Sequence, residues 1–284
     1  RHQQHPRLRI QHHPAHAAGP ALRGKIGAVV GAIPLERLRQ SRPALPLGRS
    51  QQIDDQRPLL GADHVVGGHR PALAQLVDPI VDRDEPALRA AAEPLKAGFE
   101  VVDVTRRDAV EAAVDRTVLR YGGLDGVVSN AGAAFQAPIA TCPEDHLRAS
   151  LELNLLAHQW VAAAAMRVLV PQGLGGFLLF NASKAAFNPG EGFGPYAVAK
   201  AGLVALMKQY ALEGARAGVR ANAVNADRVR TGLFPPEVVT ARAAARGLAP
   251  DDYFRANLLG REVSADDVAE AFLALALAAS TTGA

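Results

Sequence analysis

The stretch GPYAVAKAG, residues 194–202, sets a tyrosine and a lysine four positions apart among small residues. On a helix, this spacing brings Tyr196 and Lys200 to one face, one turn apart. A surface helix can show the same spacing by accident, so the surrounding sequence decides whether the pair is functional.

Segments typical of buried strands alternate with segments typical of helices over residues 84–284. Such alternation predicts an α/β fold, a doubly wound, Rossmann-like parallel sheet with helices on both faces. The expected strands are 99–104, 124–130, 175–183 and 219–225, and the expected helices are 85–98, 106–121, 143–170, 195–217 and 265–279. Capping boxes are expected at Thr105–Asp108, Thr141–Glu144 and Ser264–Asp267.

Polar residues stand at the predicted carboxyl ends of these strands. Ligands of parallel sheets bind at this edge. We therefore expect one site there, which Tyr196 enters from the start of its helix. The strand-end residues are Asp103, Asn130 with Ala131 and Gly132, Ser183, and then Asn225 and Thr231.

Residues from about 84 to 284 resemble the short-chain dehydrogenase/reductase family. No single motif is specific, since YxxxK is common by chance, but all of them occur in order and at the family's spacing. They are DVT at 103–105, NAG at 130–132, Asn154 in LELNLL, Ser183 in FNAS, YAVAK at 196–200 and VNADRVRT at 224–231.

The resemblance implies four catalytic residues. Tyr196 would be the general acid/base, and Lys200 would lower its pKa from the ordinary value of about 10 and hold the nicotinamide ribose. Ser183 would donate a hydrogen bond to the substrate oxygen, and Asn154 would hold a water linked to Lys200. The alternatives are a turn residue for Ser183 and a locally satisfied helix residue for Asn154.

The implied cofactor is NAD or NADP, with NAD favoured, and the implied substrate is a small alcohol or carbonyl compound. The cofactor contacts carried over from the family are Asp103 and Val104 at the adenine, Asn130, Ala131 and Gly132 at its ribose, Tyr196 and Lys200 at the nicotinamide ribose, and Val229 and Thr231 at the carboxamide.

Residues 1–83 depart from the family and are expected to be an atypical, irregular segment. Frequent prolines exclude long helices there, and only 26–33 is expected to pair as a strand. The glycine-rich turn that holds the pyrophosphate is not recognisable; the nearest candidate, 25–40, offers one well-placed glycine, Gly31. No second strand ending in an acid or arginine is evident. We therefore expect weak cofactor binding.

At the other end, TTGA at 281–284 would leave the family's last strand truncated. The domain prediction is therefore an atypical segment over 1–83 and a short-chain dehydrogenase-like domain over 84–284.

Charge and composition exclude several classes of function. The formal charge is +3, but residues 1–83 carry +6 and the remainder −3, so the folded part does not predict nucleic-acid binding. Five histidines before residue 17 lack acids or cysteines at metal-ligand spacing, so no metal site is expected. One cysteine, no signal peptide and no apolar run of membrane length favour a cytoplasmic protein.

Segments 188–215, 222–234 and 241–272 resemble one branch of the family, the C-terminal dehydrogenase half of bifunctional rhamnulose-phosphate aldolase/short-chain dehydrogenases. This branch implies a lactaldehyde-like or sugar-derived substrate under a lid over 233–260. Arg242, Arg246 and Arg255 in that lid could face a polar substrate, but a solvated helix face is the favoured interpretation.

The family commonly assembles through helices equivalent to 106–121 and 143–170, which implies a homodimer or homotetramer. The alternative function is a truncated, catalytically impaired remnant that only self-associates. A dinucleotide-binding turn within 20–60 would distinguish the two.

Overall fold

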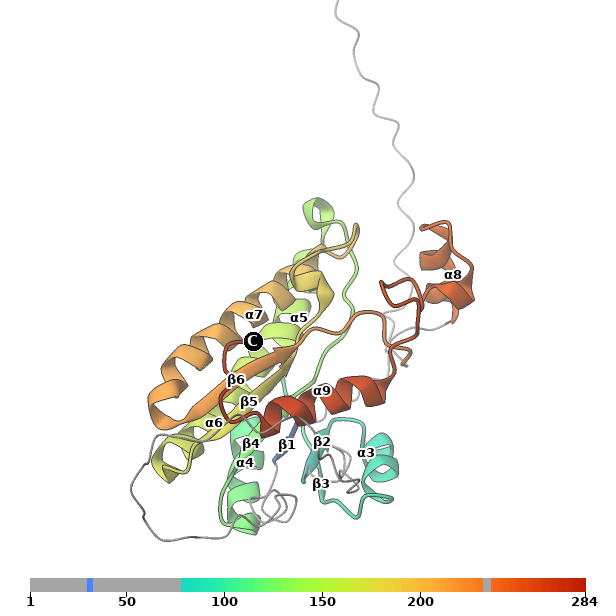
Figure 1. The fold of residues 1–284 in the computed structure, drawn as a ribbon. Helices are drawn as coiled ribbons and strands as arrows, with labels where there is room; N and C mark the ends of the chain where they lie inside the picture. The colour runs from blue at the N-terminus through green and yellow to red at the C-terminus, as the bar shows by residue number, and fades with distance from the viewer. Residues whose placement is uncertain (1–29, 33–77, 232–235) are drawn as a thin grey trace, which may run out of the picture.

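The computed structural model describes residues 30–32, 78–231 and 236–284 of the 284 (Figure 1). Most of the atypical segment, including the histidine cluster and most of the candidate turn at 25–40, lies outside the described residues.

The central sheet has four strands in the order β1-β4-β5-β6. The last three are parallel and in the predicted places, although each is shorter than its predicted range. Their bounds are β1 Val30–Ala32, β4 Gly126–Ser129, β5 Gly176–Asn181 and β6 Val219–Val224.

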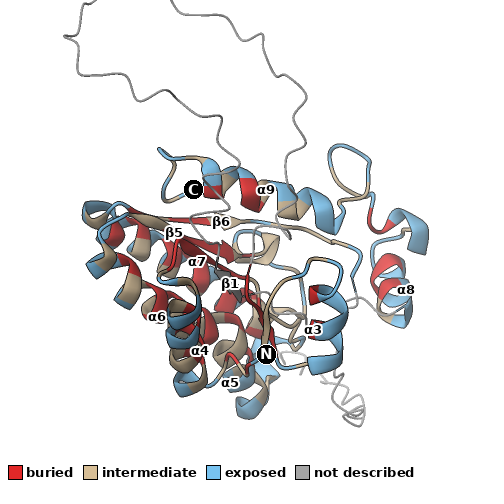
Figure 2. Cartoon of the chain, turned by 90° about the horizontal axis from the view of Figure 1, so that it is seen from below, coloured by how far each residue is buried: buried red, intermediate tan, exposed pale blue. Residues whose placement is uncertain are grey.

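Helices cover both faces of this sheet. Successive residues of β5 point to opposite faces, so its large apolar side chains are buried on both. Leu178 and Phe180 belong to the core shared with α4, α6 and α7, while Phe177 and Leu179 pack with Phe272 of α9 (Figure 2). The doubly wound fold is therefore confirmed. The bounds are α4 Arg107–Tyr121, α6 Ala157–Gln172, α7 Gly194–Gly214 and α9 Ala265–Leu277.

Strands β2 (Ile80–Asp82) and β3 (Phe99–Val101) form a separate two-stranded parallel sheet, connected by α3 (Glu85–Ala92). The prediction that 26–33 is the only strand before residue 84 is wrong, because β2 lies there too. Helix α3 is shorter than predicted and ends before Pro94, which lacks the N–H that continuation would need. Strand β3 likewise ends at Val101, short of the predicted Val104.

Strand β1 confirms pairing within 26–33, but its direction differs from that of the other strands. Val30 lies opposite Ser129 and Ala32 opposite Val127, so β1 runs antiparallel to β4. The chain therefore leaves β1 at the amino end of β4, the sheet edge opposite to Asn130.

One of the three predicted capping boxes is confirmed. The Ser264 hydroxyl accepts from the Asp267 N–H at 3.1 Å, and the Asp267 carboxylate accepts from the Ser264 N–H at 2.8 Å, so α9 begins as predicted.

The other two boxes are wrong, because the N-cap residues of α4 and of α5 (Glu144–Leu151) are Arg106 and Pro143, and neither makes a side-chain cap hydrogen bond. Thr105 gives its N–H and hydroxyl to the Asp103 carboxylate, and Asp108 pairs with Arg106.

The long helix predicted over 143–170 is present as one continuous helical element, but one turn inside it is π-helical. Helix α5 passes into a π-helical turn, η2 (Glu152–Leu156), before α6 begins. Glu144–Gln172 is long and apolar enough to cross a membrane by length and composition, a property shared by core helices. Here α6 packs against β4, α4 and α7, so the apolar residues serve the core.

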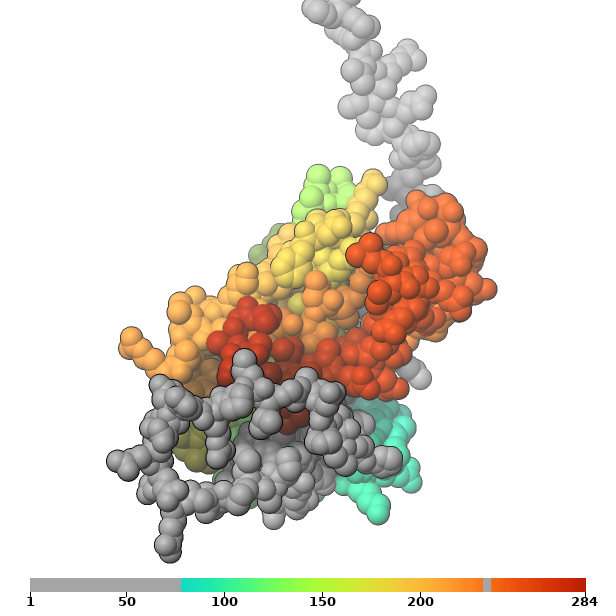
Figure 3. Space-filling view, viewed as in Figure 1, coloured from blue at the N-terminus to red at the C-terminus, as the bar shows by residue number. Residues whose placement is uncertain are grey.

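A small lobe follows β6 and contains α8 (Pro236–Ala244) and a short turn, η5 (Pro250–Asp252). It has its own apolar cluster of Val239, Ala243, Tyr253 and Phe254. In Figure 3 this orange-red lobe stands beside the yellow segment that leads into α7.

The last residues run along β6 without forming a named strand. The Gly283 N–H donates to the Ala221 carbonyl at 2.7 Å, and the Ala223 N–H donates to the Ala284 carbonyl at 2.8 Å. Arg220 fastens α9 beside them by donating to the carbonyls of Leu275, Ala276 and Ala278.

Candidate active site

A cavity of about 920 Å³ opens at the carboxyl ends of β4, β5 and β6, between the start of α7 and the lobe that carries α8. This size is within the usual range for ligand pockets. Of the residues predicted for the site, those that line the cavity are Asn130, Gly132, Ser183, Tyr196, Lys200, Val229 and Thr231.

Tyr196 stands in the first turn of α7, where the chain makes a close approach. A Cβ on Gly194 would lie 2.7 Å from the Cβ of Ile139, so this position accepts only glycine without rearrangement. Tyr196 and Ser183 line the same cavity, and the Ser183 hydroxyl lies close enough to Tyr196 to lower its pKa. Ser183 also caps the short turn after β5 by accepting from the Ala185 N–H at 3.2 Å.

Burial raises the pKa of Tyr196 above its ordinary value of 10.0, and the hydrogen bond from Ser183 and the positive charge of Arg242 oppose this rise. Burial removes water that would stabilise the phenolate, whereas a donor or a cation stabilises it.

Lys200 is fully buried, one turn after Tyr196, and its Nζ donates to the Asn181 carbonyl at 2.7 Å. Burial lowers the pKa of Lys200 from 10.5 to about 7. Its Nζ lies 5.9 Å from the centre of the Tyr196 ring. The expected lowering of the Tyr196 pKa by Lys200 stays a prediction.

Asn154 lies in the π-helical turn, on the Lys200 side of the site, and is fully buried. Its amide accepts from the Ala133 N–H at 3.1 Å and donates to the Ala133 carbonyl at 3.0 Å. A Cβ on Gly132 would lie 3.0 Å from the Asn154 Oδ1 and 3.5 Å from the Lys200 Nζ. Asn154 therefore holds the NAG loop in place, and its predicted water contact stays a prediction.

Three predicted cofactor residues lie away from the cavity lining. Val104 and Ala131 are buried in the main core, and the Asp103 carboxylate accepts from the Thr105 N–H and hydroxyl. The three residues follow strands β3 and β4 rather than ending them, and the loops there direct Val104 and Ala131 into the core.

Asn181, at the end of β5, belongs to the site although sequence reasoning missed it. Its Nδ2 donates to the Asn130 Oδ1 at 2.5 Å, and its carbonyl accepts from Lys200. Asn181 thus ties two strand ends to the lysine. Its position two residues before Ser183 was the available signal.

His158 was also missed, because a lone histidine on an apolar helix resembles an ordinary core residue. Its Nδ1 is 2.7 Å from the Ser129 hydroxyl, and both residues are buried beneath the site. Burial and the nearby Lys200 charge hold the pKa of His158 well below 6.5, so the imidazole is neutral.

Strand β2 ends in an acid, Asp82, which does not line the cavity. The expectation that no such strand exists is therefore wrong. The strand's three residues gave no readable period, but the acid after an apolar pair was the signal. Asp82 is buried, and its Oδ1 accepts from the Asp84 N–H at 2.9 Å.

Within the described residues, no group of three or more histidine, cysteine or acidic side chains is arranged to hold a metal ion.

Comparison with known proteins agrees with this fold. Residues 74–284 match the family model described as enoyl-(acyl carrier protein) reductase. The chain belongs to the short-chain dehydrogenase/reductase family. The match begins ahead of β2, ten residues before the predicted domain boundary at 84.

Two curated relatives and one solved structure illustrate the similarity. The uncharacterized oxidoreductase YuxG of Bacillus subtilis is 34% identical over 193 residues, which is 64% of this chain and 28% of YuxG. The (+)-borneol dehydrogenase 1 of Salvia officinalis is 36% identical over 176 residues, 61% of this chain and 66% of that enzyme. The chain therefore spans less than two thirds of both relatives. A short-chain type dehydrogenase/reductase of Mycobacterium ulcerans superposes with a TM-score of 0.65 at 29% identity, covering 72% of this chain and 75% of that one.

Proposed function

We propose that the chain is an NAD(P)-dependent oxidoreductase that transfers a hydride between nicotinamide and the carbon of a small alcohol or carbonyl compound. The observation that carries this proposal is that the Tyr196 and Ser183 side chains line one cavity close to each other, with Lys200 buried one turn away.

Each side chain has a defined task in this reaction. The Tyr196 hydroxyl gives a proton to the substrate oxygen during reduction and removes one during oxidation. The Ser183 hydroxyl donates a hydrogen bond to the same oxygen and stabilises its developing negative charge. Lys200 holds the ribose hydroxyls of the cofactor, and the nicotinamide, when bound, supplies or accepts the hydride.

We propose NAD rather than NADP as the cofactor because Asp82 ends β2. A carboxylate at this place accepts hydrogen bonds from ribose hydroxyls and repels an added 2′-phosphate. An Asp82→Arg variant should weaken NADH binding relative to NADPH binding.

The described residues fit the nicotinamide half of the cofactor better than the pyrophosphate. Asn130, Tyr196 and Lys200 present donors in the cavity, but β1 leaves the sheet at the opposite edge. Loss of two charge-assisted hydrogen bonds to a pyrophosphate would weaken binding by about 3–6 kcal/mol. The position of β1 at the opposite edge favours the second candidate function. This is an impaired remnant that self-associates through the α4 and α5–α6 surfaces as a homodimer or homotetramer.

For the substrate we propose a lactaldehyde-like or sugar-derived compound, by resemblance to the aldolase/dehydrogenase branch. The match covers only 28% of YuxG, so in that relative the matching region belongs to a much longer protein, as in the proposed branch.

The deciding experiment is titration of the purified chain with NADH, followed by fluorescence, and then a test of NADH oxidation with small aldehydes. Saturable NADH binding with turnover that Tyr196→Phe removes would support the enzyme. No NADH binding, together with a dimer or tetramer by sedimentation, would support the remnant.

A further inference from the structure

The lobe that carries α8 presents two arginines to the cavity. A solvated face was the favoured interpretation for Arg242, Arg246 and Arg255, and it holds for Arg255, which is exposed. For Arg242 it is wrong, because only 9% of that residue is exposed. Its guanidinium carbon lies 4.7 Å from the centre of the Phe193 ring, beside the turn that leads to Tyr196.

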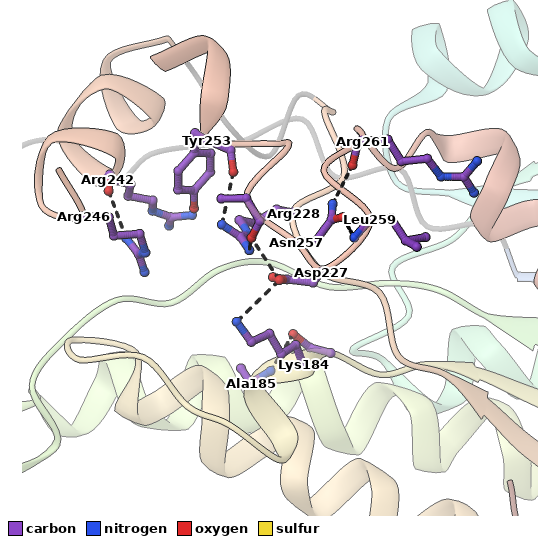
Figure 4. Close-up of polar contacts among 12 residues, drawn as sticks. Lys184, Ala185, Asp227, Arg228, Arg242, Arg246, Tyr253, Asn257, Leu259 and Arg261 are labelled. Carbon is purple, nitrogen blue, oxygen red and sulfur yellow. Dashed lines mark hydrogen bonds and ion pairs between the residues drawn. The ribbon is translucent and has the colours of Figure 1, made fainter. Parts of the chain in front are cut away.

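Arg246 follows one helical turn later and lines the same cavity. Its Nη1 donates to the Arg242 carbonyl at 3.0 Å, which orders the side chain next to its neighbour. Figure 4 shows the two guanidinium groups close together beside Tyr253. The pair therefore forms a preorganised cationic surface at the end of the cavity where Phe193 and Tyr196 lie.

The other charged residues of the cavity lining have structural or cofactor tasks. Asp227 makes ion pairs with Lys184 at 3.5 Å and Arg228 at 3.2 Å. Arg228 also donates to the carbonyls of Tyr253 and Ala256, so it holds the lobe to the strand end. Lys200 is fastened to Asn181. Among the described lining residues, cationic side chains thus outnumber acidic ones. On the lobe, the additional positive charges are those of Arg242 and Arg246.

We infer that Arg242 and Arg246 bind an anionic group, a phosphate ester or a carboxylate, on the substrate whose reacting oxygen meets Tyr196 and Ser183. Arginine presents paired N–H donors that match the oxygens of both groups. The inference rests on the proposed function and narrows its substrate to an anionic, sugar-derived compound. The competing assignment is that the two arginines bind a phosphate group of the cofactor.

Binding without turnover tests the inference separately from the proposed activity. Calorimetry on the full chain, without cofactor, would compare glycerol 3-phosphate and glycerate with uncharged glycerol. We expect glycerol 3-phosphate, glycerate or both to bind at least about tenfold more tightly than glycerol. Tyr196→Phe should keep this preference, because its hydroxyl does not contact the anion.

Two variants locate the site. Arg246→Gln, which changes an exposed side chain, should lose about tenfold in affinity for the preferred anion. Arg255→Gln on the same lobe is the matched control and should bind like the wild type. Arg242→Lys keeps the positive charge but loses the paired N–H donors of the guanidinium. It should therefore bind the preferred anion more weakly and have an unchanged circular dichroism spectrum.

Three results would overturn the inference. Equal affinity for glycerol and both anions, including no binding of any, removes the anion site. An equal loss in Arg255→Gln shows a nonspecific surface effect. A loss of NADH affinity in Arg246→Gln that matches its loss of anion affinity assigns the arginines to the cofactor. Absent turnover with a retained anion preference would contradict only the proposed function.

Discussion

The Nζ of Lys200 donates a 2.7 Å hydrogen bond to the carbonyl of Asn181, joining the first turns of α7 to the end of β5. The amine is buried, and its pKa is lowered to about 7. Near neutral pH the site therefore contains a lysine that carries its charge only part of the time, close to a tyrosine whose pKa burial raises.

Replacing Lys200 by methionine should stabilise the fold while removing activity. The unfolded lysine has a pKa near 10.4 and the native one about 7, so the unfolded state binds more protons between these values. The wild-type free energy of unfolding should thus rise from pH 7 to pH 10. The free energy of unfolding of Lys200→Met should be higher than that of the wild type by on the order of 1–3 kcal/mol at pH 7, and it should not rise between pH 7 and pH 10.

Urea denaturation between pH 7 and pH 10 measures both effects. Lys208→Met, which alters an exposed lysine of the same helix, is the matched control and should change stability by less than about 0.5 kcal/mol. A destabilised Lys200→Met variant at pH 7 would contradict the cost of burying this amine.

Replacing Tyr196 by phenylalanine should lower NADH-linked turnover by about 10²- to 10⁴-fold, because the proton donor and acceptor is lost. The ring and its contact with Phe193 remain, so the fold should persist. Steady-state rates at saturating NADH measure the effect. Tyr210→Phe removes a hydroxyl that bonds Gln159 at 2.9 Å elsewhere on α7 and should retain activity.

Replacing Ser183 by alanine should shift the pH profile of alcohol oxidation toward higher pH. Oxidation needs the Tyr196 phenolate, and loss of the Ser183 hydrogen bond that stabilises it raises the tyrosine pKa further. Profiles of kcat/KM for oxidation between pH 6 and pH 11 measure the shift. If the low-pH limb stays where the wild type has it, Ser183 does not tune Tyr196.

Replacing His158 by asparagine should remove part of the acid sensitivity of the fold. The native pKa of His158 lies well below the unfolded value of about 6.5, so protons favour the unfolded state as the pH falls through that value. The wild-type free energy of unfolding should decline by up to about 1.4 kcal/mol per pH unit below pH 6.5.

The variant should show a smaller decline even if it is less stable overall. Gln159→Asn, next to His158 on α6, changes no titratable group and is the control that should keep the wild-type slope. Identical slopes in the wild type and His158→Asn would mean that the buried imidazole is not the proton-linked group.

Local sequence determined the strand–helix alternation and the pairing of Tyr196 with Lys200 on one helix face. Periodicity acts between residues a few positions apart, so β4, β5, β6 and α7 could be located without the fold. The Ser264–Asp267 capping box could be predicted for the same reason, since both partners lie within one helical turn.

Only the tertiary structure decided which distant partner each polar side chain meets. Asp103 accepts a hydrogen bond from Thr105, the residue expected to cap α4, and the Asn154 amide forms its hydrogen bonds with the backbone of Ala133. Arg242 is buried on an aromatic ring although its helix pattern resembles a solvated face. The direction of β1 depends on pairing with a strand almost a hundred residues away. These contacts join residues far apart in the chain, and they are set by which surfaces the packed core brings within hydrogen-bond distance.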